Sequence, residues 1–110
     1  MNLTTKIIDE AQPREKNYRL HDSKGLYIEI SKSGGKWWRF KYRFNQKENR
    51  ISLGLYPEIS LTKARVRRND ARVVLAHRVD PAEYRKIIRA LKGVSAAARK
   101  LLLENITIDY

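Results

Sequence analysis

The sequence predicts an α+β fold, in which a three-stranded antiparallel β-sheet packs against α-helices in the order α-β-β-β-α-α. Two observations lead to this expectation. Apolar and polar residues alternate in three short segments between residues 26 and 54, and apolar residues recur at helical spacing in the segments before and after them. The chain has 110 residues, 42% of them hydrophobic, which suffices for the single modest core of one domain.

A short helix is expected over residues 3–11. Thr4 can accept a hydrogen bond from a free amide of the first helical turn, and the leucine and isoleucines of this segment share one face. Pro13 ends the helix. We expect residues 13–23 to form a polar connection to the first strand.

The first strand is predicted over Leu26–Ile30, where one leucine and two isoleucines alternate with Tyr27 and Glu29. This alternation is typical of a half-buried strand. The segment Ser33-Gly34-Gly35 follows directly, and its glycines suit the positive-φ positions of a hairpin turn. A second strand should therefore run antiparallel to the first.

That second strand, Lys36–Phe44, is the most informative part of the sequence. Because side chains alternate across a strand, the aromatic and the cationic residues separate onto two faces. One face should enter the core, with Trp38, Phe40, Tyr42 and Phe44, and the other should form a cationic ribbon, with Trp37, Arg39, Lys41 and Arg43. A polar turn over residues 45–49 and a third strand over residues 50–54 complete the predicted meander.

Two helices are expected after the sheet. Ser60 is a good N-cap for a helix from residue 61 to about residue 76, whose apolar stripe would lie across the sheet. Arg68 falls inside that stripe, and we attribute this first to a side chain that carries its charged head to the edge of the core, and second to a functional role. Asp80 and Pro81 form a cap and first position for a further helix ending near Leu91.

The charge of the chain predicts a polyanionic partner. There are 24 Lys and Arg against 12 Asp and Glu, which gives a net charge of +12. Residues 36–68 alone hold ten basic and two acidic residues. A random scatter of basic residues would not concentrate in this way, whereas a clustered patch is the expected footprint of nucleic-acid binding.

Several classes of protein are excluded or disfavoured. The chain has no cysteine, which rules out disulfides, thiolate zinc sites and cysteine nucleophiles, and its two histidines make a metal site improbable. We expect no cofactor and no catalytic activity, and we interpret His21 and Asp22 as a structural polar pair in a loop rather than a catalytic base. The longest apolar run is far shorter than the roughly 20 residues of a membrane span, and no signal peptide is evident. These features predict a soluble, intracellular protein.

The cationic ribbon suits the major groove of duplex DNA, which admits a β-ribbon and exposes the base edges to its side chains. Arginine can bond guanine through two nitrogens, and lysine can reach a phosphate. Trp37, on the charged face, is the aromatic residue expected to have a functional role. The predicted DNA-binding residues are Lys36, Trp37, Arg39, Lys41, Arg43, Lys47, Arg50, Lys63 and Arg67.

A series of short motifs resembles one protein family. In order, they are Lys24-Gly25-Leu26-Tyr27-Ile28, the strand Lys36–Arg43, Leu53-Gly54, Tyr56-Pro57, Ser60-Leu61, Ala64-Arg65 and Asp80-Pro81. Together they resemble the N-terminal arm-type DNA-binding domain of P4-like phage integrases, which are tyrosine recombinases. The resemblance covers roughly Leu3–Arg85.

The resemblance implies a domain that holds a recombinase at arm-type attachment sites during integration or excision of a prophage or genomic island. It also implies a three-stranded sheet packed with helices and a location in the cytoplasm of a bacterial host. Integrases of this kind continue into core-binding and catalytic domains, so this chain is not expected to recombine DNA alone. We expect residues 1–86 to form the DNA-binding domain and residues 87–110 a helical extension or linker.

Two alternatives stay open at the level of the sequence. The same sheet could bind single-stranded nucleic acid or RNA if Trp37 and its neighbours stack on unpaired bases. The chain could also be a protein-interaction domain of a recombination complex, contacting other integrase subunits or accessory proteins. Duplex DNA is the preferred partner, and no membrane partner is expected.

Overall fold

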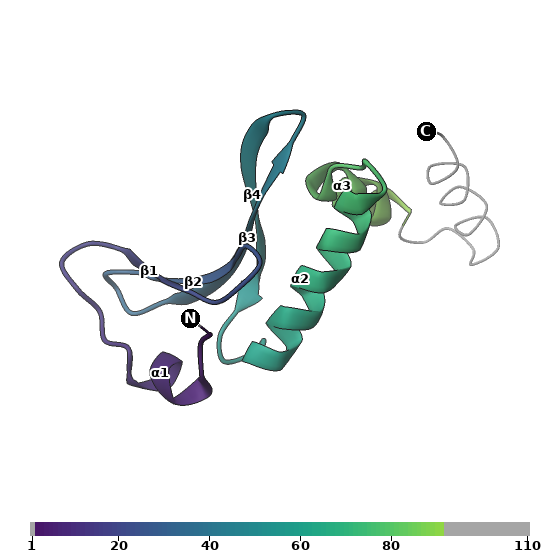
Figure 1. Ribbon diagram of the computed structural model, residues 1–110. Coiled ribbons are helices and arrows are strands. Elements are labelled where there is room, and N and C mark those ends of the chain that lie inside the picture. Colours follow the sequence, from purple (N-terminus) through teal and green to yellow (C-terminus); the bar gives the residue numbers. More distant parts are fainter. Residues whose placement is uncertain (1, 92–110) are drawn as a thin grey trace. The chain divides into compact units, whose positions relative to one another are not determined.

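The computed structural model describes residues 2–91 of the chain. Along the sequence the elements are α1 (Thr5–Glu10), β1 (Tyr18–His21), β2 (Leu26–Ile30), β3 (Lys36–Phe44), β4 (Lys47–Leu55), α2 (Leu61–Ala76) and α3 (Pro81–Ala90) (Figure 1). The chain divides into two compact units, Met1–Ala71 and Arg72–Tyr110, with the boundary inside α2. The first unit therefore holds the whole sheet, α1 and the first part of α2.

The sheet has four antiparallel strands in the order β1-β2-β3-β4, so the expected count of three is wrong. The additional strand, β1, lies within residues 13–23, which were expected to form only a polar connection. It pairs with β2 from Tyr18 opposite Ile30 to His21 opposite Tyr27. This pairing satisfies the backbone groups along an edge of β2 that would otherwise be unpaired.

The inward face of the sheet agrees with the prediction from β3. Trp38 is completely buried, Phe40 and Tyr42 are buried beside it, and the two rings of Phe40 and Tyr42 stack with centroids 5.5 Å apart. The indole Nε1 of Trp38 donates a hydrogen bond of 2.7 Å to the carbonyl oxygen of Ile59. The helix α1 adds the fully buried Ile8 to this core, and Thr4 caps α1 as expected by accepting a hydrogen bond from the Ile7 amide.

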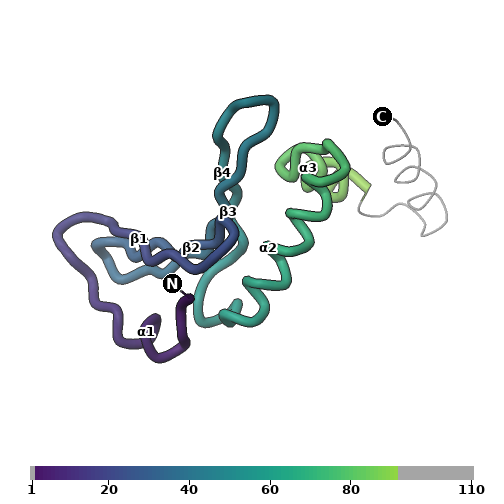
Figure 2. Tube along the Cα trace, in the orientation of Figure 1, coloured from purple at the N-terminus to yellow at the C-terminus, as the bar shows by residue number. Residues whose placement is uncertain are grey.

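The β3–β4 hairpin is longer than expected. Its turn consists of Asn45 and Gln46, both with positive φ, and β4 begins at Lys47 instead of residue 50. The last β3 residue paired with β2 is Phe40, so the rest of the hairpin projects beyond β2 (Figure 2). The pairing shifts by one residue after Trp38, where Gly54 has a φ of +115° and a Cβ would lie 2.6 Å from Ile59. The projecting part is therefore a two-stranded ribbon, and it carries part of the candidate site described below.

The first part of α2 is joined to the sheet through a buried carboxylate. Asp22 accepts hydrogen bonds from Arg65, from Arg68 and from the Leu3 amide, with donor–acceptor distances of 2.8–3.1 Å. Arg68 is only 5% exposed, so the explanation that its head reaches solvent is wrong. Its place in the apolar stripe is explained instead by this buried ion pair, whose partner lies 46 residues earlier.

This network also changes the acidity of Asp22. Burial by itself would raise its pKa, but hydrogen bonds from Arg65 and from the backbone amides of Leu3 and Ser23, together with the charge of Arg65, lower the pKa to about 2. The same hydrogen bond and charge raise the pKa of Arg65. Both groups therefore remain ionised at neutral pH, and the N-terminus, the β1–β2 turn and α2 are held to one another.

The second unit contains the end of α2 and the helix α3. Asp80 accepts a hydrogen bond of 2.9 Å from the Ala82 amide, and Pro81 occupies the first helical position, as expected. The helix ends at Ala90, one residue before the predicted end. Most of the extension predicted over residues 87–110 lies outside the described residues. Within residues 2–91, no helix is long and apolar enough to cross a membrane.

Candidate nucleic-acid interface

The sheet has a second face, opposite the core, that carries most of the candidate binding residues. The strand register places Arg19 opposite Glu29, Tyr27 opposite Arg39 and Lys41 opposite Arg50 on this side. We call it the outer face and define it by Arg19, His21, Tyr27, Glu29, Trp37, Arg39, Lys41, Arg43, Glu48, Arg50, Ser52 and Leu55. Five of these side chains are cationic and two are anionic, so the face retains a positive charge.

Glu29 lies between two arginines from the neighbouring strands. Its carboxylate oxygens are 3.8 Å from Nε of Arg19 on β1 and 3.9 Å from Nε of Arg39 on β3. The side chains of Glu29 and Arg39 are mostly buried, but at these distances the ion pairs are long. The two ion pairs position the arginines, because the single carboxylate of Glu29 keeps both guanidinium groups close to the surface of the sheet.

An aromatic side chain lies beside these arginines. Trp37 is 42% exposed on the outer face, as predicted, and the guanidinium of Arg39 is 5.2 Å from its ring centroid. Leu55, which faces Trp37 across β3 and β4, is also exposed. The outer face therefore combines a planar cation with an accessible apolar surface.

The projecting hairpin carries the remaining cations of the face. The Lys41 ammonium is 3.2 Å from Glu48, and Arg43 donates a long hydrogen bond of 3.4 Å to the Gln46 carbonyl oxygen. Arg43 and Arg50 are exposed, and Lys47 lies at the tip next to the turn. These contacts leave most of the side-chain donors of the hairpin directed at solvent.

Three of the predicted binding residues lie elsewhere. Lys36 is on the inner side of β3, where its ammonium donates a hydrogen bond of 2.6 Å to the Ile8 carbonyl of α1. Arg67 belongs to α2 and donates a hydrogen bond of 2.9 Å to the Leu53 carbonyl. Lys63 is exposed in the first turn of α2. The structure thus brings together Trp37, Arg39, Lys41, Arg43 and Arg50 on the outer face, with Lys47 at the hairpin tip.

Arg19, His21 and Tyr27 were missing from the predicted set. Tyr27 was expected on the polar side of a half-buried strand, yet it is only 1% exposed. The Arg19 guanidinium lies 4.9 Å from its ring centroid, and the His21 ring is tilted against it at 5.5 Å. The signal available in the sequence was the short alternation Tyr18-Arg19-Leu20-His21.

His21 and Asp22 were interpreted as a polar pair within a loop. His21 instead ends β1 and packs against Tyr27, while the Asp22 carboxylate bonds to Arg65 and Arg68. Both residues thus make structural contacts, but with other partners. Among residues 2–91 there is no cluster of three or more histidine, cysteine or acidic residues that could hold a metal ion.

Comparison with known proteins adds a decisive observation. Residues 3–87 match the model of a protein family described as the Arm DNA-binding domain. The chain belongs to the Arm DNA-binding domain family. This match confirms the resemblance drawn from the motifs, and it includes the entire sheet together with α2.

Several curated relatives of this arm DNA-binding domain are named integrases. It is 38% identical over 92 residues to the integrase of Enterobacteria phage P4, which covers 82% of this chain and 21% of the relative. It is 39% identical over 98 residues to prophage integrase IntZ of Escherichia coli K12, covering 87% of this chain and 24% of the relative. The integrase of Shigella phage Sf6 is 39% identical over 84 residues, which covers 76% of this chain and 22% of the relative.

The chain therefore spans between a fifth and a quarter of the length of these relatives. The part shared with them is the arm DNA-binding domain, whose family description names DNA binding. The outer face is the surface of this module whose chemistry fits that task.

Proposed function

We propose that this arm DNA-binding domain binds duplex DNA at arm-type attachment sites by inserting the outer face of its sheet into the major groove. The observation that carries the proposal is the projecting β3–β4 ribbon, which bears Lys41, Arg43 and Arg50 on one side, with Arg39 next to its base where β3 still pairs with β2. The major groove is about 12 Å wide and accommodates a two-stranded ribbon. It also displays a distinct donor and acceptor pattern for each base pair.

The side chains divide by how firmly they are held. Arg39 is restrained by Glu29 and by the ring of Trp37, and a restrained guanidinium is suited to bidentate bonding with guanine. Lys41 and Lys47 are exposed and flexible, which suits contacts with phosphates. Lys36 and Arg67 bond to carbonyl groups of the domain itself, so we place them outside the main contact surface, and Lys63 would be a peripheral phosphate contact.

The setting we propose is that of an integrase of a prophage or genomic island. Residues 1–86 would be the DNA-binding part and residues 87–110 an extension or linker. The module would act in the bacterial cytoplasm, where attachment sites lie, with other integrase subunits or accessory proteins as further partners. The chemical steps of recombination are not assigned to this chain.

A titration tests the proposal. A duplex selected by the protein from a randomised pool is compared with a scrambled duplex, a single strand and an RNA of matched length. We expect the selected duplex to bind most tightly, and Arg43→Ala to weaken it. Lys6→Ala, an exposed change on α1, is the control. Preference for single strands or RNA would support a stacking surface instead, and failure of all four probes would support a protein-interaction domain.

A further inference from the structure

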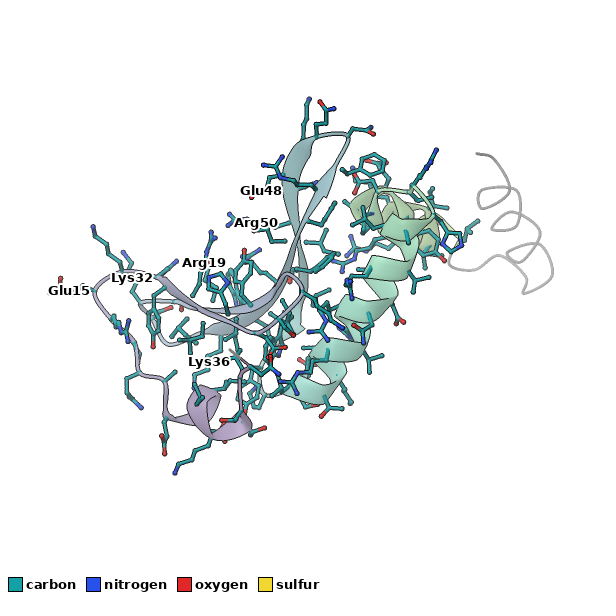
Figure 3. All side chains as sticks on the ribbon, in the orientation of Figure 1. Glu15, Arg19, Lys32, Lys36, Glu48 and Arg50 are labelled. Carbon is teal, nitrogen blue, oxygen red and sulfur yellow. The ribbon has the colours of Figure 1, made fainter. Side chains whose placement is uncertain are left out.

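A cavity of about 250 Å³ opens on the outer face where the projecting hairpin leaves β2. Residues of all four strands line it, namely Arg19, Tyr27, Lys41, Glu48, Asn49 and Arg50. In Figure 3, Arg19 and Arg50 extend from different strands toward the same side of the sheet, and Glu48 follows Arg50 toward the end of the hairpin. The volume is sufficient for one tetrahedral oxyanion with water.

The cavity contains a buried polar group without a partner. The hydroxyl oxygen of Tyr27 is inaccessible to solvent and has no hydrogen-bond partner. The ring of Tyr27 is buried and contacts both Arg19 and His21, which restricts the position of the hydroxyl. A buried hydroxyl that is left unbonded costs free energy, and such a group in a native structure calls for an explanation. A ligand that accepts its hydrogen bond would supply one.

The charges around the cavity indicate the kind of ligand. Arg19, Lys41 and Arg50 are cationic, whereas Glu48 is the one anionic side chain of the lining. Glu48 is paired with Lys41 across 3.2 Å, but both side chains are about half exposed, so the pair is weak and can open. Asn49 directs its amide to the Tyr42 hydroxyl and does not compete for the same ligand. Two guanidinium groups, an ammonium and a hydroxyl donor together suit a phosphate.

We propose that this cavity is a phosphate pocket that binds one backbone phosphate of the duplex. Neighbouring side chains move aside as the phosphate enters, so that the Tyr27 hydroxyl, which is inaccessible to solvent without the ligand, donates a hydrogen bond to it. Arg19, Lys41 and Arg50 supply the opposing charge, and Lys41 exchanges Glu48 for the phosphate. The inference rests on the proposed binding of duplex DNA and adds a fixed anchor to it. Because phosphate contacts set register and orientation, the pocket would align the arginines of the hairpin with particular base pairs.

The test replaces single phosphates by neutral methylphosphonates along the selected duplex and measures binding by fluorescence anisotropy. In the wild-type domain, we expect one position to lose affinity by about tenfold, the effect of a charge-assisted hydrogen bond. Tyr27→Phe should weaken the unmodified duplex by a similar factor and should lose less than wild type at that position, because the hydrogen bond of the hydroxyl is already absent while the charges of Arg19, Lys41 and Arg50 remain. Its melting temperature should not fall, because only an unbonded hydroxyl is removed. Tyr84→Phe, a change on α3, is the matched control.

Two further variants separate charge from hydrogen bonding. Arg50→Gln should weaken binding and make the dependence of log affinity on log salt shallower by about one, whereas Tyr27→Phe, which carries no charge change, should leave that slope unaltered. Glu48→Gln should strengthen binding, because Lys41 no longer has a competing carboxylate.

The outcomes distinguish the pocket from the proposed function. If Arg43→Ala weakens binding but Tyr27→Phe binds like wild type with an unchanged methylphosphonate pattern, the pocket is refuted and groove binding stands. If neither variant changes affinity, the proposed function itself fails. If inorganic phosphate raises the melting temperature of wild type but not of Tyr27→Phe, and no methylphosphonate position matters, the pocket binds a free anion and the proposal is overturned.

Discussion

Asp22 and Arg68 form an ion pair in the interior of the domain, with Nη1 of Arg68 3.1 Å from Oδ2 of the carboxylate. The side chain of Asp22 is fully buried and that of Arg68 nearly so. Arg65 completes the arrangement at 2.9 Å. A buried pair does not by itself imply a large gain in stability, because both charges lose hydration. Its importance is that Asp22 cannot be removed without leaving the buried guanidinium of Arg68 without a counter-charge, whereas Asp22 would keep Arg65 if Arg68 were removed.

Asp22→Ala should therefore destabilise the domain strongly. The variant leaves the buried guanidinium of Arg68 without a counter-charge, and breaking a buried pair in this way costs about 3–5 kcal/mol. Urea unfolding followed by circular dichroism measures the loss. Glu83→Ala removes an exposed partner of Lys86 and is the control, with an expected change within about 0.5 kcal/mol. A loss for Asp22→Ala as small as that of the control would contradict this account.

The same carboxylate predicts how stability depends on pH. The pKa of Asp22 is lowered to about 2 in the folded domain, and the ordinary value for an unfolded chain is about 3.9. A depressed carboxyl pKa contributes stability that is fully present above the unfolded value and is lost as the pH falls through the folded value. By linkage the contribution is about 2–3 kcal/mol, lost mostly between pH 4 and pH 2.

Melting curves recorded between pH 6 and pH 2 test this expectation. Wild type should lose more stability than Asp22→Asn over the acidic part of that range, because the variant has no carboxyl group to titrate at this position. Parallel curves for the two proteins would show that other groups carry the acid dependence.

The two neighbouring tryptophans should respond in opposite ways to alanine. Trp38→Ala deletes a completely buried ring and the hydrogen bond to the Ile59 carbonyl, so it should cost about 3–5 kcal/mol and impair binding only through unfolding. Trp37→Ala removes an exposed ring, so it should stay folded and weaken duplex binding by loss of support for Arg39. Thermal melting and a duplex titration of each variant distinguish the two effects. A folded Trp38→Ala that loses DNA would mean that the aromatic face is the binding surface.

The sequence was informative wherever a pattern extended over several residues. Alternation through β3 indicated both faces of that strand, and the caps at Thr4, Ser60 and Asp80 marked the starts of three helices. The family resemblance rested on spaced motifs within the same segments. The DNA-binding class of the domain could therefore be predicted from the sequence.

What the sequence did not indicate depends on contacts between distant residues. The strand β1 has only two apolar side chains, and its pairing is favoured by the free edge of β2, which no local pattern reveals. The place of Arg68 in an apolar stripe could not be explained from the sequence, because its partner Asp22 lies 46 residues earlier in the chain. Tyr27 becomes buried through Arg19 and His21, which belong to the unpredicted strand. The proposed phosphate pocket was missed for the same reason.

Salt provides the last test, of the outer face as a whole. If the sheet and its flanking loops together neutralise roughly five or six phosphates, log affinity should fall against log salt with a slope near −5 and a loss of about a thousandfold between 50 and 200 mM. Arg39→Ala and Arg43→Ala should each weaken the selected duplex by about 1–3 kcal/mol if they bond to bases. Arg43→Ala, an exposed change, should leave stability within about 0.5 kcal/mol, as is usual for surface changes.

Lys41→Ala should behave differently from the two arginines in the same titrations. A phosphate contact carries no sequence information, so selected and scrambled duplexes should weaken about equally, and the salt slope should become shallower by about one. The comparison of selected with scrambled duplex separates base contacts from phosphate contacts within one strand. A nearly flat salt response in wild type, or equal losses on both duplexes for Arg39→Ala and Arg43→Ala, would mean that the outer face does not read bases in the groove.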